Sequence, residues 1–321
     1  MGKLREFVFL GTGTSGSVPN IHCLIRDPPT CEVCMAAIKA EPPSGTQPLQ
    51  LPRFSKNRRR NTSGLVRFMH SDGRMRNVLI DCGKTFYESA LTWFVEYGFQ
   101  RIDAVLLTHG HADAIMGKRI DDLRQWTIGP RHHRIQDVVN VYLDQSTMEV
   151  VRRAFPYAVD TNKATGSGEV PMIKFHVISA DQQGPMPFII EDELVVTPFE
   201  VEHGKAGSKP YMSLGFRFED LSYVSDANAF PLTAARIVKG SKYLIVDALH
   251  PEPHSSHFSF SQAIQECLYA LPKGGHGFFT GLSHNVLHDD LNKYLAADER
   301  IRTAGITVEV GYDGQRIPIN Q

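Results

Sequence analysis

The feature that most constrains the fold is a short apolar run that ends in a cluster of histidine and aspartate. Residues 102–107 are typical of a buried strand, and His109, His111 and Asp113 follow it at alternate positions. Side chains spaced in this way can direct two imidazoles and one carboxylate toward a common point. Imidazole and carboxylate together suit zinc, manganese or iron. The sequence therefore predicts a metal site at the end of a buried strand.

Two more potential ligands stand at the ends of predicted strands further along the chain. His203 follows the strand-like residues 200–202, and Asp226 follows 223–225. An HxHxD motif alone is also compatible with a polar loop whose groups satisfy one another, but that interpretation leaves the two later residues unexplained. We therefore expect all five side chains to contribute to one metal-binding site.

The distribution of predicted strands and helices favours two sheets in layers. Strand-like runs dominate both halves of the chain, helical spacing is interspersed, and no internal repeat is visible. This pattern indicates a layered α/β arrangement rather than a single doubly wound sheet. The expected strands are 64–69, 77–81, 102–107, 138–143, 194–199, 214–218, 222–225 and 243–246, the expected helices are 84–97, 120–126, 147–155, 259–270 and 289–298, and a final hairpin is expected over 307–318.

Charge and composition limit the expected partners. The 321 residues carry 34 Lys and Arg against 35 Asp and Glu, so the whole-chain field offers no attraction to nucleic acid. No run approaches the roughly 18 consecutive apolar residues of a membrane span, and we expect neither a leader segment nor a lipid anchor. Five cysteines, an odd number, fit a reducing compartment better than a disulfide framework. We expect a cytoplasmic protein without a membrane partner, and a homodimer is left open.

Three of the cysteines lie close together in an unusual stretch of the chain. Residues 20–62 are rich in Pro, Cys and Arg and show little periodicity, so an irregular excursion is expected there. Cys23, Cys31 and Cys34 fall inside it, at a spacing that suits a metal ion better than disulfides.

The complete pattern resembles the metallo-β-lactamase superfamily over nearly the whole chain. The residues that match its motifs are Asp81 in the sequence Ile80-Asp81-Cys82-Gly83, then His109, His111 and Asp113 of the HxHxDH motif, then His203 and Asp226. The resemblance implies one domain over residues 1–321 with a four-layer αββα sandwich and a metal site at one edge. Within the superfamily, Leu10-Gly11-Thr12-Gly13, the early cysteines and Asp226-Ala227-Asn228 are similar to the cyclic phosphodiesterase group of phosphonate degradation and, more distantly, to tRNase Z.

The resemblance to the phosphodiesterase group also implies roles for individual residues. Cys23, Cys31, Cys34 and His284 would hold a structural zinc, because three thiolates and one imidazole form a closed tetrahedral set. His257 would assist catalysis from outside the metal shell, Arg60 or Arg124 would bind the phosphate, and Asp81 would orient a ligand histidine. His109, His111 and His203 would bind the first catalytic ion, and Asp226 would bridge toward a second ion held partly by Asp113.

The sequence departs from the superfamily pattern at two positions. Ala114 replaces the last histidine of HxHxDH, and Gly281 replaces a later histidine after Thr280. Both missing imidazoles would belong to the second ion, so Asp122 and His288 are considered as replacement ligands. A carboxylate in place of an imidazole would favour manganese or magnesium over zinc. One metal, a remodelled second site and an inactive scaffold all remain open at this point.

These residues predict a metal-dependent hydrolase that acts on a small cyclic or sugar-linked phosphodiester. A metal-bound water with its pKa lowered toward ~7 would attack the phosphorus. A tRNA 3′-processing nuclease is a first alternative, although no basic, Gly- and Pro-rich arm is obvious. A metal-stabilised scaffold without activity is a second, and hydrolysis of a thioester or lactam is a third.

Overall fold

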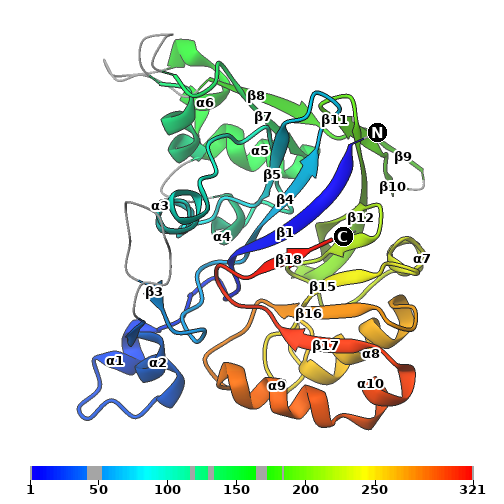
Figure 1. Ribbon diagram of the computed structural model, residues 1–321. Helices are drawn as coiled ribbons and strands as arrows, with labels where there is room; N and C mark the ends of the chain where they lie inside the picture. Colours follow the sequence, from blue (N-terminus) through cyan, green and yellow to red (C-terminus); the bar gives the residue numbers. More distant parts are fainter. Residues whose placement is uncertain are drawn as a thin grey trace.

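Two large β-sheets face each other in the computed structural model, with helices on both outer faces (Figure 1). Phe7 and Phe9 from the first sheet pack with Phe216 and Tyr223 from the second in the fully buried layer between them. This is the predicted four-layer αββα sandwich. The structure describes residues 2–41, 53–115, 120–128, 134–163, 172–182 and 184–319.

The first sheet combines an antiparallel and a parallel half. Its order is β18-β1-β4-β5-β6-β7-β8, antiparallel as far as β5 and parallel from β5 to β8. The pairs β9 with β10 and β2 with β3 form two small separate sheets. The bounds are β1 Lys3–Gly11, β2 Ala40–Glu41, β3 Arg53–Phe54, β4 Ser63–Met69, β5 Met75–Ile80, β6 Ala104–Leu106, β7 Val139–Leu143, β8 Ile173–Val177, β9 Ala180–Asp181, β10 Gly184–Pro185 and β18 Arg316–Pro318.

The second sheet repeats this plan. Its order is β11-β12-β13-β14-β15-β16-β17, antiparallel as far as β14 and parallel from β14 to β17. The strands alternate with helices in the parallel half, so the carboxyl ends of neighbouring strands lie at one edge. The bounds are β11 Phe188–Ile190, β12 Leu194–Ala206, β13 Lys209–Phe218, β14 Leu221–Tyr223, β15 Tyr243–Asp247, β16 His276–Thr280 and β17 Thr307–Val310.

Helices cover the outer face of each sheet and bury a separate apolar layer against it. Trp93 and Phe94 of α3 pack on the first sheet, and Ile264 and Cys267 of α8 pack on the second. The bounds are α1 Ile21–Leu24, α2 Glu32–Ala37, α3 Phe86–Tyr97, α4 Ala112–Ile115, α5 Gln145–Ala154, α6 Pro156–Val159, α7 Leu232–Val238, α8 Phe260–Ala270, α9 His288–Ala297 and α10 Glu299–Ala304, with 3₁₀ helices η1 at Ile120–Trp126 and η3 at Thr161–Lys163.

Local sequence explains where the main helices begin and end. The Asp144 side chain accepts a hydrogen bond from the Thr147 amide and caps α5, and Ser259 with Gln262 forms a capping box at α8. The helix α3 ends at Gly98, whose positive φ of 66° closes the last turn. In the part of the chain that the structure describes, no helix is both long and apolar enough to cross a membrane.

The expected hairpin over 307–318 is wrong. β17 is the last strand of the second sheet, whereas β18 pairs with β1 at the edge of the first. The turn-like Asp313 lies at the corner between the sheets, where its carboxylate accepts hydrogen bonds from the Thr12 hydroxyl (2.8 Å) and the Arg60 amide (2.9 Å). These bonds direct the chain from one sheet to the other, so the Asp-Gly pair does not close a hairpin.

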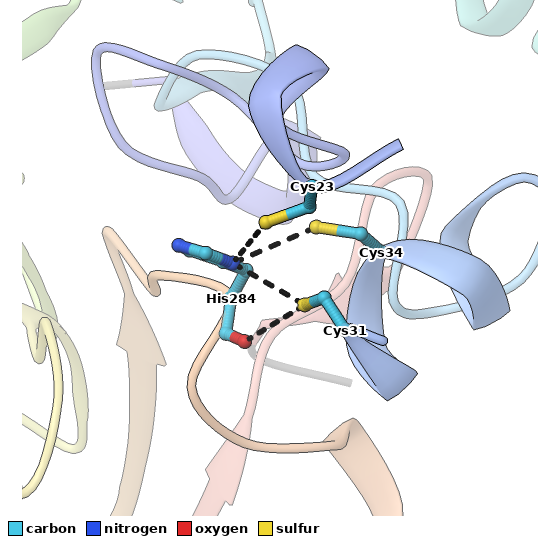
Figure 2. Close-up of side chains that lie close together, drawn as sticks. All are labelled: Cys23, Cys31, Cys34 and His284. Carbon is cyan, nitrogen blue, oxygen red and sulfur yellow. Dashed lines mark hydrogen bonds between the residues drawn. The ribbon is translucent and has the colours of Figure 1, made fainter. Parts of the chain in front are cut away.

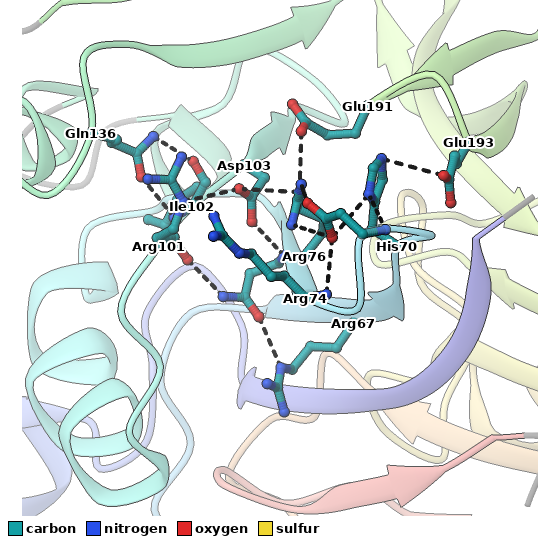
Figure 3. A network of polar contacts seen from close by, with 12 residues as sticks. Arg67, His70, Arg74, Arg76, Arg101, Ile102, Asp103, Gln136, Glu191 and Glu193 are labelled. Atoms are coloured by element: carbon teal, nitrogen blue, oxygen red, sulfur yellow. Dashed lines mark hydrogen bonds and ion pairs between the residues drawn. The ribbon is translucent and has the colours of Figure 1, made fainter.

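A polar network joins the two sheets at the end opposite to the predicted metal site (Figure 3). Arg76 donates to Glu191 (3.1 Å), which precedes β12, and to Asp72 (2.7 Å) in the β4–β5 turn. Asp103 is buried and accepts a hydrogen bond from the Asn77 amide at 2.8 Å. The network therefore fixes the starts of β5 and β12, whose other ends carry Asp81 and His203.

We predict that Asp103→Ala destabilises the protein without changing its metal content. The substitution leaves the buried Asn77 amide without its acceptor, which costs about 1–3 kcal/mol in the free energy of unfolding. Urea denaturation measures the loss. Asp72→Ala is the matched control, because that carboxylate of the same network is exposed and its ion pair with Arg76 is screened by solvent. Equal losses in the two variants would contradict the prediction.

Candidate metal centre

Three histidines from the two sheets converge at one edge of the sandwich. His109 and His111 follow β6 of the first sheet, and His203 lies near the end of β12 in the second. One ring nitrogen from each lies within 4.8 Å of the others. His109 is buried at 2% exposure and His203 at 7%, whereas His111 is exposed and closes the cluster from the solvent side. The structure thus brings together the three imidazoles predicted for the first ion.

A β-bulge directs His203 into this cluster. The pairing of β12 with β13 jumps from Glu202↔Met212 to Lys205↔Pro210, so two residues of β12 stand opposite Tyr211 alone. Gly204 has a φ of 78°, and a Cβ there would lie 2.9 Å from the Ser256 Cβ. Tyr211 stacks on the His111 ring, with centroids 4.7 Å apart.

Hydrogen bonds on the far side of the rings decide which nitrogens face the cluster. The Thr108 hydroxyl donates to Asp81 (2.8 Å), so it accepts from His109 Nδ1–H at 2.8 Å and leaves Nε2 as a lone pair. His203 donates through Nδ1–H to the Ser256 carbonyl at 2.8 Å, which also leaves its Nε2 as a lone pair. Asp81 therefore acts through Thr108, in agreement with its predicted orienting role.

The ring nitrogens of the cluster lie close to one another and to the Asp226 carboxylate. His109 Nε2 is buried without a hydrogen-bond partner and lies 3.4 Å from Asp226 Oδ2. Burial and the neighbouring imidazoles hold the pKa of His109 well below its usual value, so the ring is neutral. His203 Nε2 lies 3.3 Å from His111 Nδ1. A tetrahedral zinc with bonds of about 2.0–2.1 Å would separate its ligands by about 3.4 Å, so the donor set fits such an ion.

Asp247 belongs to the site and was not identified from the sequence. It ends β15, next to the strand that leads to Asp226, and with His257 these two carboxylates form a second group with ligand atoms within 4.8 Å. Asp247 Oδ2 accepts from His257 Nδ1–H (2.8 Å) and from the Ala227 amide (3.2 Å). Its Oδ1 is buried without a partner. The one sequence signal that could have identified Asp247 is its place as an acidic residue at the end of an apolar strand.

The two departures from the superfamily pattern have different structural settings. Ala114 is buried in the apolar layer under α3. Gly281 has a φ of 72°, and a Cβ there would lie only 2.3 Å from Asp247 Oδ1. A side chain at position 281 would therefore begin next to the Asp247 carboxylate. Asp113 is partly buried in α4, and burial together with the charge of Asp226 raises its pKa.

Three residues predicted for the catalytic site lie elsewhere. Asp122 is buried in η1 and lines a cavity with α3, because the 3₁₀ turn directs it toward Phe86 and Trp126. His288 begins α9 and bonds to Asn292, so the helix holds it away from the cluster. Arg60 donates to Thr92 of α3 at 3.1 Å and pairs with Asp313 at 3.7 Å. Its guanidinium thus supports the corner between the sheets.

The predicted structural zinc ligands meet at a second place, outside the sandwich (Figure 2). His284 Nδ1 lies 3.4 Å from Cys23 Sγ, 3.4 Å from Cys31 Sγ and 3.6 Å from Cys34 Sγ. A tetrahedral zinc would place sulfur and nitrogen ligands about 3.6 Å apart. All three cysteines are free thiols. The distances and the donor types therefore fit one closed zinc site.

Two short helices and a buried arginine build this second site. Cys23 lies in α1, Cys31 immediately precedes α2, and Cys34 lies in α2. Arg59 is fully buried and donates to the carbonyls of Ser283 and Val286, on either side of His284. The predicted excursion over 20–62 is thus partly helical around the cysteines, and its residues 42–52 lie outside the described residues.

The comparisons with known proteins agree with the fold and the site. A family model described as a β-lactamase superfamily domain matches residues 76–273, and the chain belongs to this family. Members of the superfamily are metal-dependent hydrolases. The chain is similar to a diphosphatase of the PhnP family, with 26% identity, 98% of each chain covered and a TM-score of 0.71. This likeness confirms the predicted relationship to the phosphodiesterase group.

Two further relatives add less about function. Zinc-bound PqqB from Methylobacterium extorquens has a TM-score of 0.62 at 16% identity, and the match covers 98% of this chain and 100% of the PqqB chain. At this identity the likeness shows the fold alone. An octanoyltransferase of Porphyromonas gingivalis is 28% identical over 260 residues, which are 80% of this chain. The match spans only 42% of that protein, so less than half of its length corresponds to this chain.

We predict that Cys31→Ser removes one zinc per chain and lowers the melting temperature. Loss of one thiolate opens the closed set, and binding energy at a structural zinc is folding energy. Metal analysis and thermal unfolding measure the two effects. Cys267→Ser is a control for the loss of a thiol, because Cys267 is buried in α8 away from the site. Unchanged zinc content in Cys31→Ser would refute the assignment.

We predict that Thr108→Val weakens metal binding at the histidine cluster by about 10- to 100-fold. The valine keeps the shape but removes the hydroxyl that orients His109 and joins it to Asp81. Competition with a chelator measures the affinity. Thr147→Val is the matched control, since that buried hydroxyl has no hydrogen-bond partner. Equal affinity in both variants would show that the hydroxyl does not orient the ligand.

Proposed function

We propose that the protein is a metal-dependent phosphodiesterase that acts on a small cyclic or sugar-linked phosphodiester. One observation carries the proposal: Asp226 lies between two groups of different chemistry. Its Oδ2 is 3.4 Å from His109 in the three-histidine cluster, and its Oδ1 is 4.0 Å from His257. An ion site and a proton donor therefore lie on either side of one carboxylate, so a nucleophile and a general acid would both be supplied to one substrate.

The ion site would supply the nucleophile. His109, His111, His203 and Asp226 would hold zinc or manganese, and the ion would supply a water with its pKa lowered toward ~7. The chain itself keeps these ligands in position, since Thr108 and the Ser256 carbonyl fix the rings of His109 and His203. Tyr211, stacked on His111, bounds the cluster on the solvent side.

His257 would protonate the leaving oxygen. Its Nδ1–H is held by Asp247, so the opposite ring nitrogen is the one available to a substrate. Burial alone would lower the pKa of His257, but the charges of Asp247 and Asp226 raise it to about 9. These carboxylates favour the protonated ring, which is the form that can donate a proton to a leaving oxygen.

One of the comparison proteins supports phosphorus as the reacting centre. The relative with 26% identity over nearly the whole chain is a diphosphatase, and its family is the one that the sequence motifs resemble. Neither the balanced charge of the chain nor its motifs favour RNA as substrate. The proposal therefore places this chain with small-molecule phosphodiesterases rather than with nucleases.

A substrate panel tests the proposal directly. We expect the zinc- or manganese-loaded protein to hydrolyse bis(p-nitrophenyl) phosphate and at least one cyclic or sugar-linked phosphodiester. The same preparation should leave a precursor tRNA, a β-lactam and an acyl thioester intact. Turnover of the lactam or thioester without turnover of any phosphodiester would overturn the proposal, and so would complete inactivity with full metal occupancy.

We predict that His257→Ala keeps its metal but loses about 10²- to 10⁴-fold in turnover, the usual contribution of a positioned acid. His109→Ala should lose both metal and activity, because its Nε2 faces the ion. His276→Ala, at the start of β16, controls for removal of a histidine. Metal analysis with steady-state kinetics separates these roles. Equal metal loss in His257→Ala and His109→Ala would show that His257 is a ligand.

We further propose a second catalytic ion held by carboxylates in place of the missing imidazoles. Burial raises the pKa of Asp113 and of Asp226, and the charges of Asp226 and Asp247, respectively, add to the two shifts. Asp247 Oδ1 is buried without a partner. Buried carboxylates in mutual repulsion are stabilised by a cation, and oxygen ligands favour manganese or magnesium. Asp247 would thus take the role first considered for Asp122 and His288.

Crystals soaked in manganese test this second ion. We expect two anomalous peaks in the catalytic region, one at the three histidines and one at Asp113, Asp226 and Asp247. Asp247→Asn should lose the second peak and keep the first. A single peak in the unmodified protein would exclude the carboxylate site, while leaving the one-metal phosphodiesterase unaffected.

A further inference from the structure

A second cavity lies along the outer edge of the second sheet, apart from the catalytic groups. It has a volume of about 470 Å³ and is bounded by β17, the last strand of that sheet, by α9 and α10, and by the turn that contains Tyr312. Its floor is aliphatic, since Leu295, Val308 and Val310 are members of the buried apolar layer. None of the catalytic or zinc-binding side chains described above lines it.

A buried imidazole at this cavity has a hydrogen-bond donor without an acceptor. The Val310 amide donates to Asn292 Oδ1 at 2.9 Å, which fixes the orientation of the Asn292 amide group. The Asn292 NH₂ group must then donate to His288 Nε2, 3.0 Å away. Because Nε2 accepts, the proton of the neutral ring is on Nδ1. Nδ1 is buried without a partner, and the His288 side chain is only 3% exposed.

The charged groups at the cavity favour an anion. Lys56 is exposed, lies with Nζ 4.7 Å from the centroid of the Tyr312 ring, and forms no ion pair with any described residue. Arg302 adds a second positive charge. Glu309 is the opposing charge in the lining, and its carboxylate accepts from Gln315 at 3.3 Å. The Asp289 carboxylate, 4.0 Å from His288 Nε2, is 81% exposed.

We propose that this cavity is a second small-molecule site that binds an organic anion with a short apolar body. An oxygen of its carboxylate or phosphate group accepts the hydrogen bond from His288 Nδ1–H, and Lys56 neutralises the charge. The apolar body packs on Leu295 and Val308. Burial and the charge of Lys56 lower the pKa of His288 to about 4, so the ring stays a neutral donor at physiological pH.

Binding of three probes to the full-length chain tests the site. Hexanoate, hexyl phosphate and 1-hexanol share the apolar body and differ in the head group. We expect saturable shifts of the amide NMR signals of α9 and β17 with hexanoate, hexyl phosphate or both, and at least tenfold weaker binding of 1-hexanol. The stronger anion identifies the head group as carboxylate or phosphate. No saturable binding of either anion, or equal binding of the alcohol, would overturn the proposal.

Two further measurements connect the binding to named residues. Lys56→Met should weaken anion binding at least tenfold, whereas Lys293→Met, an exposed lysine of α9, should leave it unchanged. Lys56 lies outside the apolar core, so this variant is expected to fold. Imidazole ¹⁵N shifts should show His288 protonated at Nδ1. Equal affinity in the two lysine variants, or a proton on Nε2, would refute the assigned contacts.

Discussion

The parallel pairing of β14, β15 and β16 is the constraint on which the catalytic site depends. Parallel neighbours have their carboxyl ends at the same edge, so this pairing places Asp226, Asp247 and Gly281 side by side after their strands. β6 of the first sheet delivers His109 to the same edge, and the bulge of β12 turns His203 toward it. The site is thus a product of strand direction in two sheets and needs no single continuous motif.

Much of this arrangement could be predicted from the sequence, because ligands at the ends of apolar strands have a recognisable pattern. The three histidines, Asp226 and the Cys₃His group all meet as expected. Asp247 was missed because no motif spacing marks it, and only the pairing of β15 beside β14 brings it to the site. Asp122 and His288 were chosen for closeness in sequence, which does not determine where the side chain of a helical residue points.

The corner between the sheets also could not be predicted from the sequence. An Asp-Gly pair between two strand-like runs is a normal hairpin signal. Here Asp313 bonds to Thr12 and Arg60 and separates two strands that belong to different sheets. The guanidinium of Arg60 is held at the same corner by Thr92 and Asp313. When a residue type suits two roles, only its contacts in the folded chain show which role it has.

The Cys₃His site has a consequence for the order in which the molecule is assembled. Cys23 and His284 are 261 positions apart in the chain. During synthesis, at about 5–20 residues per second, the three thiols are therefore exposed for many seconds before the fourth ligand leaves the ribosome. During this interval the nascent chain presents an incomplete thiolate trio, open to oxidation or to capture by the wrong metal. Biosynthesis of this protein should therefore be most sensitive to copper or oxidant stress before its last strands are made.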